Sequence, residues 1–176
     1  MNWFTSDPHY FHKHVIEYCN RPFASLDEMH AMLIANWNMF VSPDDAIYVI
    51  GDFSFGNAEQ TKSIIKQLYG DKYLIVGNHD KGHSKTWWKN AGFIDAVDSM
   101  TLKLGVHEIE LCHFPSGTPM VKTYEPIYDP SNPRWLLCGH VHNRWKIEKN
   151  IINVGVDVWN FLPVADFQIS RIIGGW

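Results

Sequence analysis

Short apolar runs alternate with amphipathic segments through the first half of the chain. Residues 46–50 and 73–76 are continuously apolar, which is typical of strands buried on both faces of a sheet. Residues 2–7 begin apolar and end polar, which predicts a further strand. Because helical patterns separate these runs, we expect strands and helices to alternate over this half.

Capping signals mark the starts of the helices. Ser25 and Glu28 predict a capping box that opens a helix with apolar residues at spacings near 3.6. Asn57 can cap a second helix, which Gly70 would end. A short third helix is predicted over residues 84–91. Each of these helices falls between two of the predicted strands.

The second half of the chain has a different pattern. The segment after residue 160 fits both a helix and a strand. Residues 115–133 carry five prolines, and a loop of that length in a compact domain is often a functional flap. Strands are predicted over residues 99–104, 108–112, 135–138 and 151–154, the first two joined as a hairpin. The whole pattern predicts an α/β fold in which two mixed sheets form a β-sandwich flanked by helices.

Composition narrows the class of protein. With 176 residues, of which 45% are hydrophobic, the chain suits a single domain over residues 1–176. No apolar run reaches the roughly 18–20 residues that span a bilayer, and the start of the chain has no signal-peptide pattern. Three cysteines without regular spacing fit a reducing compartment, so we expect a cytoplasmic protein. The net charge of −4 argues against extended nucleic-acid binding, and the pattern does not indicate an oligomeric state.

Five of the predicted strands are followed by residues that can bind metal ions. In chain order these are Asp7 with His9, Asp52, Asn78, His113, and His140 with His142. Taken singly, such residues are more often turn residues, helix caps or packed histidines. Taken together, two carboxylates, one amide and several imidazoles at strand ends predict a site for two divalent metal ions.

The spacing of these residues indicates how the ions would be held. Residues i and i+2 of extended backbone point the same way, so Asp7 with His9 can grip one ion, and His140 with His142 can do the same. Asp52 can bridge two ions. Mixed nitrogen and oxygen ligands without a thiolate favour Mn, Fe, Zn, Ni or Co over Mg or Ca. Manganese is the ion that we expect.

The candidate ligands and some segments around them resemble those of a known protein family. Residues 3–7, 18–23 and 153–159 are similar to segments of a compact subgroup found in phages and bacteria. The motifs that resemble the calcineurin-like metallophosphoesterase family as a whole are Asp-x-His at 7–9, Gly-Asp at 51–52, Gly-Asn-His-Asp at 77–80, His113, and Gly-His-x-His at 139–142. The resemblance implies a metallophosphoesterase-like αββα fold and a metal-dependent phosphoesterase.

The resemblance also implies a role for each matching residue. His79 matches the family's catalytic histidine, which is not a ligand. The acidic residue that orients this histidine in some members is missing from the segment after Asp52, and Asp80 is the candidate to replace it as a catalytic residue. The implied ligands are Asp7, His9 and His142 for the first ion, Asp52 as the bridge, and Asn78, His113 and His140 for the second.

The implied reaction is hydrolysis of a phosphoester. A hydroxide bridging the two ions would attack phosphorus, and His79 would donate a proton to the departing oxygen. Arg144 and Asn78 are the candidate substrate-binding residues, while Trp87 and Trp88 could either stack on a base or pack inside. An open site without a large cap insertion suits a small phosphodiester, such as a nucleotide. Two alternatives stay open: a phosphomonoesterase, including a protein phosphatase, and a catalytically silent metal-binding scaffold.

Overall fold

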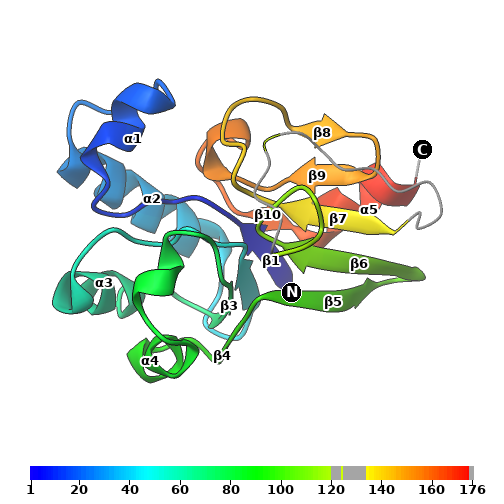
Figure 1. The fold of residues 1–176 in the computed structure, drawn as a ribbon, viewed down its shortest axis with the longest axis horizontal. Coiled ribbons are helices and arrows are strands. Elements are labelled where there is room, and N and C mark those ends of the chain that lie inside the picture. The colour runs from blue at the N-terminus through cyan, green and yellow to red at the C-terminus, as the bar shows by residue number, and fades with distance from the viewer. Residues whose placement is uncertain (120–123, 125–133, 175–176) are drawn as a thin grey trace.

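The computed structural model describes residues 1–119, 124 and 134–174, and it contains two five-stranded sheets (Figure 1). In spatial order, the first sheet consists of β10 (Val164–Ala165), β1 (Asn2–Thr5), β2 (Ala46–Val49), β3 (Asp71–Ile75) and β4 (Asp95–Val97). The second consists of β5 (Ser99–Leu104), β6 (His107–Cys112), β7 (Trp135–Cys138), β9 (Ile151–Asn153) and β8 (Ile147–Glu148).

Both sheets are mixed. In the first sheet β1 to β4 are parallel and β10 is antiparallel. In the second sheet β6, β7 and β9 are parallel, while β5 and β8 are antiparallel edge strands. The predicted α/β fold, with two mixed sheets flanked by helices, is therefore confirmed.

The helices flank these sheets and connect their strands (Figure 1). Among the described residues, none of them combines the length and apolar character needed to cross a membrane. The helices are α1 (Lys13–Tyr18), α2 (Leu26–Phe40), α3 (Ala58–Ile65), α4 (Lys85–Ala91) and α5 (Asp166–Gly174), with 3₁₀ turns η1 (Asp80–Gly82) and η2 (Val156–Val158).

Alternate residues of the first sheet face two different cores. Trp3, Ile47 and Leu74 pack against apolar residues of α2, α3 and α4. Phe4 and Ile75 face the other way and pack against apolar residues of β6, β7, β9 and α5. Burying one such side chain fully contributes about 1.5–3 kcal/mol relative to leaving it exposed. The two cores therefore fix the strands, and with them the positions at which the strands end.

The capping signals locate the helix starts well and the helix ends less well. Ser25 Oγ accepts from the N–H of Glu28 at 3.2 Å, but the Glu28 carboxylate accepts from Ala24, one residue before the cap. Asn57 forms a full capping box with Gln60. The helix that Asn57 opens stops at Ile65, about a turn before the predicted end at Gly70, although Leu68 beyond it is buried.

Several short elements carry too little pattern to be predicted. Neither α1 nor the strands β4, β8 and β10 were expected, because two or three residues show no periodicity and the start of α1 has no side-chain cap. The ambiguous segment after residue 160 forms β10 and then α5. The predicted flap over residues 115–133 lies mostly outside the described residues.

Parallel pairing brings the candidate site together. Because β1, β2 and β3 are parallel, their carboxyl ends lie at one edge of the first sheet, and those of β6, β7 and β9 lie at one edge of the second. A bridge between Ser6 and Gly155 joins the end of β1 to the end of β9. The N–H of Gly139 donates to the carbonyl of His113 at 3.1 Å, which joins the ends of β7 and β6. The turns after these strands therefore meet.

Candidate metal centre

Six of the predicted ligands form two compact groups. The first consists of Asp7, His9 and His142, and the second of Asp52, His113 and His140. Within each group, one possible ligand atom of each residue lies within 4.8 Å of the others. The residues come from the turns after β1, β2, β6 and β7, so the centre draws on both sheets.

Asp52 lies between the two groups. His9 Nε2 is 3.7 Å from Asp52 Oδ2 and 3.6 Å from Asp7 Oδ1. His113 Nε2 is 3.4 Å from the same oxygen of Asp52 and 3.2 Å from Asn78 Oδ1. One carboxylate oxygen of Asp52 thus faces side chains of both groups, which is the placement that a bridging ligand needs.

Several buried atoms of the two groups lack hydrogen-bond partners. These atoms are Asp7 Oδ1, both ring nitrogens of His9, and His140 Nε2. Buried polar atoms are nearly always paired, and leaving one unpaired costs about 1–3 kcal/mol. A carboxylate oxygen and one nitrogen of each neutral imidazole offer a lone pair, so a divalent cation in each group would satisfy Asp7 Oδ1, one nitrogen of His9, and His140 Nε2. The donor set fits ions that accept both imidazole and carboxylate.

The ligand turns have unusual backbone geometry. The φ angle is positive at Asp7 (54°), His9 (51°), Asp52 (56°), His140 (70°) and His142 (49°). Asp and His enter this left-handed region more readily than most residues, yet each such position still costs about 1–3 kcal/mol. Asp7 and His9 do lie together, as predicted, but the predicted reason, an extended backbone, is wrong. The paired ligands converge because tight turns direct them inward.

The glycines of the motifs leave room for these ligands. A Cβ added to Gly77 would overlap the Asp52 carboxylate, and one added to Gly51 would overlap the ring of His113. A Cβ on Gly139 would overlap a carboxylate oxygen of Asp7. The glycines before Asp52, Asn78 and His140 thus reflect the close approach of the strand ends.

Asp80 lies beneath the centre. Its carboxylate accepts the N–H groups of Asp52, Phe53 and Gly77 at 2.8–2.9 Å. In the part of the chain that the structure describes, no hydrogen bond joins this carboxylate to His79. These contacts tie the turn that carries Asp52 to Gly77 after β3, and the predicted role of Asp80 in orienting His79 stays a prediction.

His79 differs from the ligands because it is accessible. Its N–H donates to Asp52 Oδ1 at 2.9 Å, and its ring Nε2 lies 3.9 Å from Asp52 Oδ2. The side chain is 45% exposed and lies against the ring of Phe55, with 4.5 Å between ring centroids. The ring can therefore reach a molecule bound over the centre while its backbone is fixed by a candidate ligand.

Protonation separates the histidines into two kinds. Burial, together with the charge on His113, lowers the pKa of His140 to about 4. Burial alone would also lower the pKa of His113, but the Asp52 carboxylate raises it to about 9. Burial is likewise outweighed at His142, where the hydrogen bond to Asp157 raises the pKa to about 11. Without metal, the rings of His113 and His142 are therefore protonated on both nitrogens and positively charged at neutral pH, whereas the ring of His140 is neutral.

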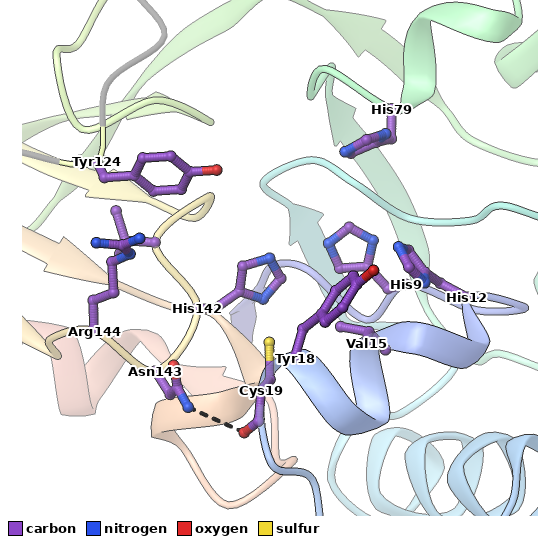
Figure 2. Close-up of a pocket in the computed structure, with 11 residues that line it drawn as sticks. His9, His12, Val15, Tyr18, Cys19, His79, Tyr124, His142, Asn143 and Arg144 are labelled. Carbon is purple, nitrogen blue, oxygen red and sulfur yellow. Dashed lines mark hydrogen bonds between the residues drawn. The ribbon is translucent and has the colours of Figure 1, made fainter.

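A pocket of about 550 Å³ opens over the centre (Figure 2). Arg144, the candidate substrate-binding residue, lies on its wall with the guanidinium carbon 4.4 Å from the ring centroid of Tyr124. Tyr124 in turn stacks on His140, with 4.6 Å between centroids. The opposite wall is α1 and its flanks, which contribute His12, Val15, Tyr18 and Cys19. Sequence reasoning missed this wall because α1 was not predicted.

Trp87 and Trp88 lie outside the pocket. Trp88 is buried, and its indole N–H donates to the backbone carbonyl of Asp80 at 3.2 Å. Trp87 stacks on His83, with 3.6 Å between ring centroids. The packing interpretation of these tryptophans therefore holds. Aromatic surface beside the pocket comes instead from Phe55, which is 42% exposed.

A third group of possible metal ligands consists of Cys19, His142 and Asp157. Its chemistry differs from that of the first two, because Asp157 already has partners. Its oxygens accept from Arg21 Nε at 2.7 Å, from Arg21 Nη2 at 3.0 Å and from His142 Nδ1 at 3.0 Å. We therefore interpret Asp157 as a support for His142. Sequence reasoning assigned no role to Arg21 or Asp157, although both lie in segments that resemble the compact subgroup.

Comparisons with known proteins place the chain among relatives of unassigned function. No family model matches it. The uncharacterized protein MJ1445 of Methanocaldococcus jannaschii is 30% identical over 177 residues, which cover 96% of this chain and 88% of the relative. The protein of unknown function AQ665 from Aquifex aeolicus has the same fold, with a TM-score of 0.72, 23% identity and 98% of each chain covered.

A weaker structural likeness is to YfcE, a phosphoesterase from Escherichia coli. The TM-score is 0.45 with 16% identity, over 88% of this chain and 77% of that one. A likeness at this level carries no inference about the present chain.

Gly77→Ala should disrupt the centre while leaving the rest of the fold intact. The added Cβ would lie 2.6 Å from the backbone nitrogen of Asp52 and would overlap its carboxylate. We expect a loss of stability of about 1–3 kcal/mol and weakened binding of divalent metal. Gly82→Ala is the matched control, since its Cβ would have no atom within 4 Å. Equal metal binding by the two variants in calorimetric titration would contradict the geometry.

Metal binding should release protons. His113 and His142 hold protons at neutral pH because their pKa values are raised, and a proton at the nitrogen that binds the ion competes with the metal. We expect about one proton released per ion at pH 7, and an apparent metal affinity that falls as the pH falls. Calorimetry in buffers of different ionisation enthalpy measures the release. An affinity that does not change between pH 6 and 8 would refute this protonation scheme.

Proposed function

We propose that this chain, which belongs to the same protein family as the Methanocaldococcus jannaschii protein MJ1445, is a dinuclear metal-dependent phosphodiesterase. The observation that carries the proposal is the pair of ligand groups that meet at Asp52 and contain buried, unpaired donors. The motif resemblance to calcineurin-like metallophosphoesterases supports it independently of that geometry. Manganese is the ion that we propose, with Fe, Zn, Ni and Co as alternatives that the same donors accept.

The proposed division of ligands follows the two groups. Asp7, His9 and His142 would hold the first ion, Asp52 would bridge, and His113, His140 and the amide oxygen of Asn78 would hold the second. When bound, two divalent ions polarise the phosphoryl oxygens and supply an activated water as the nucleophile. The protein would contribute fixed ligand positions, since the N–H groups of Asp7, His9 and Gly139 donate to backbone carbonyls of neighbouring ligand turns.

His79 is the proposed general acid. Its ring is exposed to the pocket, and its backbone N–H donates to Asp52, so the ring would lie beside a phosphoester bound at the centre. A proton delivered to the leaving oxygen is worth about 10²–10⁴-fold in rate. Phe55 covers one side of the ring and limits its motion.

The pocket favours a phosphodiester over a phosphomonoester. A dianionic monoester is best gripped by several cationic groups, and Arg144 is the arginine on the described pocket wall. Arg21 lies nearby, but its guanidinium donates to protein acceptors behind the ligand turn. The pocket volume and the exposed aromatic rings of Tyr18 and Phe55 suit a small, nucleotide-like diester. A catalytically silent scaffold would have no need of an accessible His79.

The general-acid role predicts a dependence on the leaving group. For metal-stripped protein reloaded with Mn²⁺, His79→Ala should lower kcat on a dinucleotide by about 10²–10⁴-fold. The loss on bis-nitrophenyl phosphate should be much smaller, because nitrophenolate departs without a proton. Asp52→Asn should abolish metal-dependent turnover of both substrates, because it removes the proposed bridge.

His83→Ala is the matched control for His79→Ala. This histidine lies four residues further along, stacks on Trp87, and does not line the pocket. It should retain the activity of the parent protein. If His79→Ala lost the same factor on both substrates, His79 would be a binding residue, and the assignment as a general acid would fail. A preference for mono-nitrophenyl phosphate would favour the phosphomonoesterase alternative.

Arg144→Gln should act mainly on substrate binding. A charged hydrogen bond to a phosphate oxygen contributes about 1.5–3 kcal/mol, so we expect KM to rise by about tenfold or more with kcat little changed. Arg134→Gln is the control, because Arg134 is exposed before β7 and pairs with Glu108 at 3.6 Å. An unchanged KM in steady-state kinetics would remove Arg144 from the site.

A further inference from the structure

Arg21 is a buried arginine whose donors are all used. Its Nε donates to Asp157 Oδ1 at 2.7 Å and its Nη2 to Asp157 Oδ2 at 3.0 Å, so the pair is bidentate. The remaining contacts are Nη2 to the carbonyl of Asp7 at 2.8 Å, and Nη1 to the carbonyl of Pro8 at 3.0 Å and to Met29 Sδ at 3.4 Å. Five N–H donors thus meet five acceptors. The guanidinium is 0% exposed, and none of its capacity is left for a substrate.

The two partners of this pair act on the same half of the centre. Arg21 holds the carbonyls of Asp7 and Pro8 in the turn between β1 and His9, where Asp7 and His9 have positive φ angles. Asp157 accepts from Nδ1 of His142 at 3.0 Å, which leaves Nε2 of that ring for an ion. The pair therefore supports this group through the backbone carbonyls of Asp7 and of Pro8, which precedes His9, and through the side chain of His142.

The second half of the centre has a different support. His113 donates from Nδ1 to the carbonyl of Ile50 at 2.8 Å, and the Asp52 turn is held by Asp80. Within the described residues, the hydrogen bonds of Arg21 and Asp157 do not reach Asp52, His113 or His140. The hydrogen bonds of the Arg21–Asp157 pair thus go to the first group, and the two groups meet where the N–H of His140 donates to Asp7 Oδ2 at 2.9 Å.

We propose that Arg21 and Asp157 are positioning residues that set the affinity of one metal site, the one formed by Asp7, His9 and His142. The inference rests on the proposed function for the presence of two ions, and goes beyond it by assigning a role to residues that touch neither ion nor substrate. Carboxylates that orient a ligating histidine typically change metal affinity by 10–100-fold when removed. Arg21 and Asp157 are 136 residues apart in the sequence. The metal affinity of this site therefore depends on the correct packing of the N-terminal part of the chain against the C-terminal part.

The test is Mn²⁺ titration of metal-stripped protein by calorimetry, with electron paramagnetic resonance on the same samples. For the parent protein we expect two equivalents and a spin-coupled signal. In Asp157→Asn, one equivalent should bind 10–100-fold more weakly and the other should be unchanged, with an uncoupled mononuclear signal at intermediate metal. Arg21→Lys should behave similarly, because a lysine retains the charge but cannot form the fork.

Two further variants separate positioning from folding. Asp44→Asn is the matched control: it removes the same charge from an exposed residue before β2, and both affinities should stay as in the parent. Removing one member of a buried ion pair can prevent folding, whereas replacing both with apolar residues often does not. Arg21→Met combined with Asp157→Leu should therefore fold, judged by its melting transition, and still show the weakened site.

The outcomes distinguish this inference from the proposed function. Equal weakening of both sites in Asp157→Asn, or unchanged affinities in the double variant, would overturn the positioning role while leaving the two-metal enzyme intact. A parent protein that binds two ions with the expected asymmetry in the variants, yet hydrolyses no phosphodiester, would refute the function and retain the inference. A parent protein that binds fewer than two ions would overturn both.

Discussion

Two buried carboxylates, Asp7 and Asp52, impose the constraint on which the rest of the centre depends. Both are almost completely inaccessible, and Asp7 Oδ1 has no hydrogen-bond partner. Burial would raise the pKa of each, yet neighbouring imidazoles hold both pKa values below the ordinary range. An ionised carboxylate in such a place costs several kcal/mol unless positive charge compensates it. Two divalent cations would supply that charge in place of the protons that they displace from the imidazolium groups.

Three features of the fold place the two carboxylates and the other candidate ligands together. Parallel strands in two sheets bring the ligand turns to one side of the molecule. Glycines at 51, 77 and 139 let those turns approach closely, and left-handed backbone at the ligands directs the side chains inward. Buried polar residues behind the turns, Asp80 under one half and Arg21 with Asp157 behind the other, then fix them. Strain in the turns is offset by these contacts and by the two apolar cores.

The sequence predicted the parts of this design that follow from local pattern. Continuous apolar runs identified the central strands, and polar residues after them identified the groups that the structure brings together, although their role as ligands stays a prediction. Reasoning from extended backbone was wrong for Asp7 and His9, because a tight turn has no hydrophobic period to reveal it. Short elements such as α1 and β10 were not predicted for the same reason. The pairing of Arg21 with Asp157 could not be predicted, since it depends on tertiary packing between distant segments.

The most direct test of the central claim is anomalous diffraction from a crystal of the protein soaked in Mn²⁺. A two-metal centre predicts two strong peaks about 3.5–4 Å apart, with Asp52 between them. One peak should lie among Asp7, His9 and His142, and the other among His113, His140 and Asn78. A single peak would contradict a two-metal centre. A peak among Cys19, His142 and Asp157 would contradict the interpretation of Asp157 as a support, and with it the assignment of His142 to the first ion.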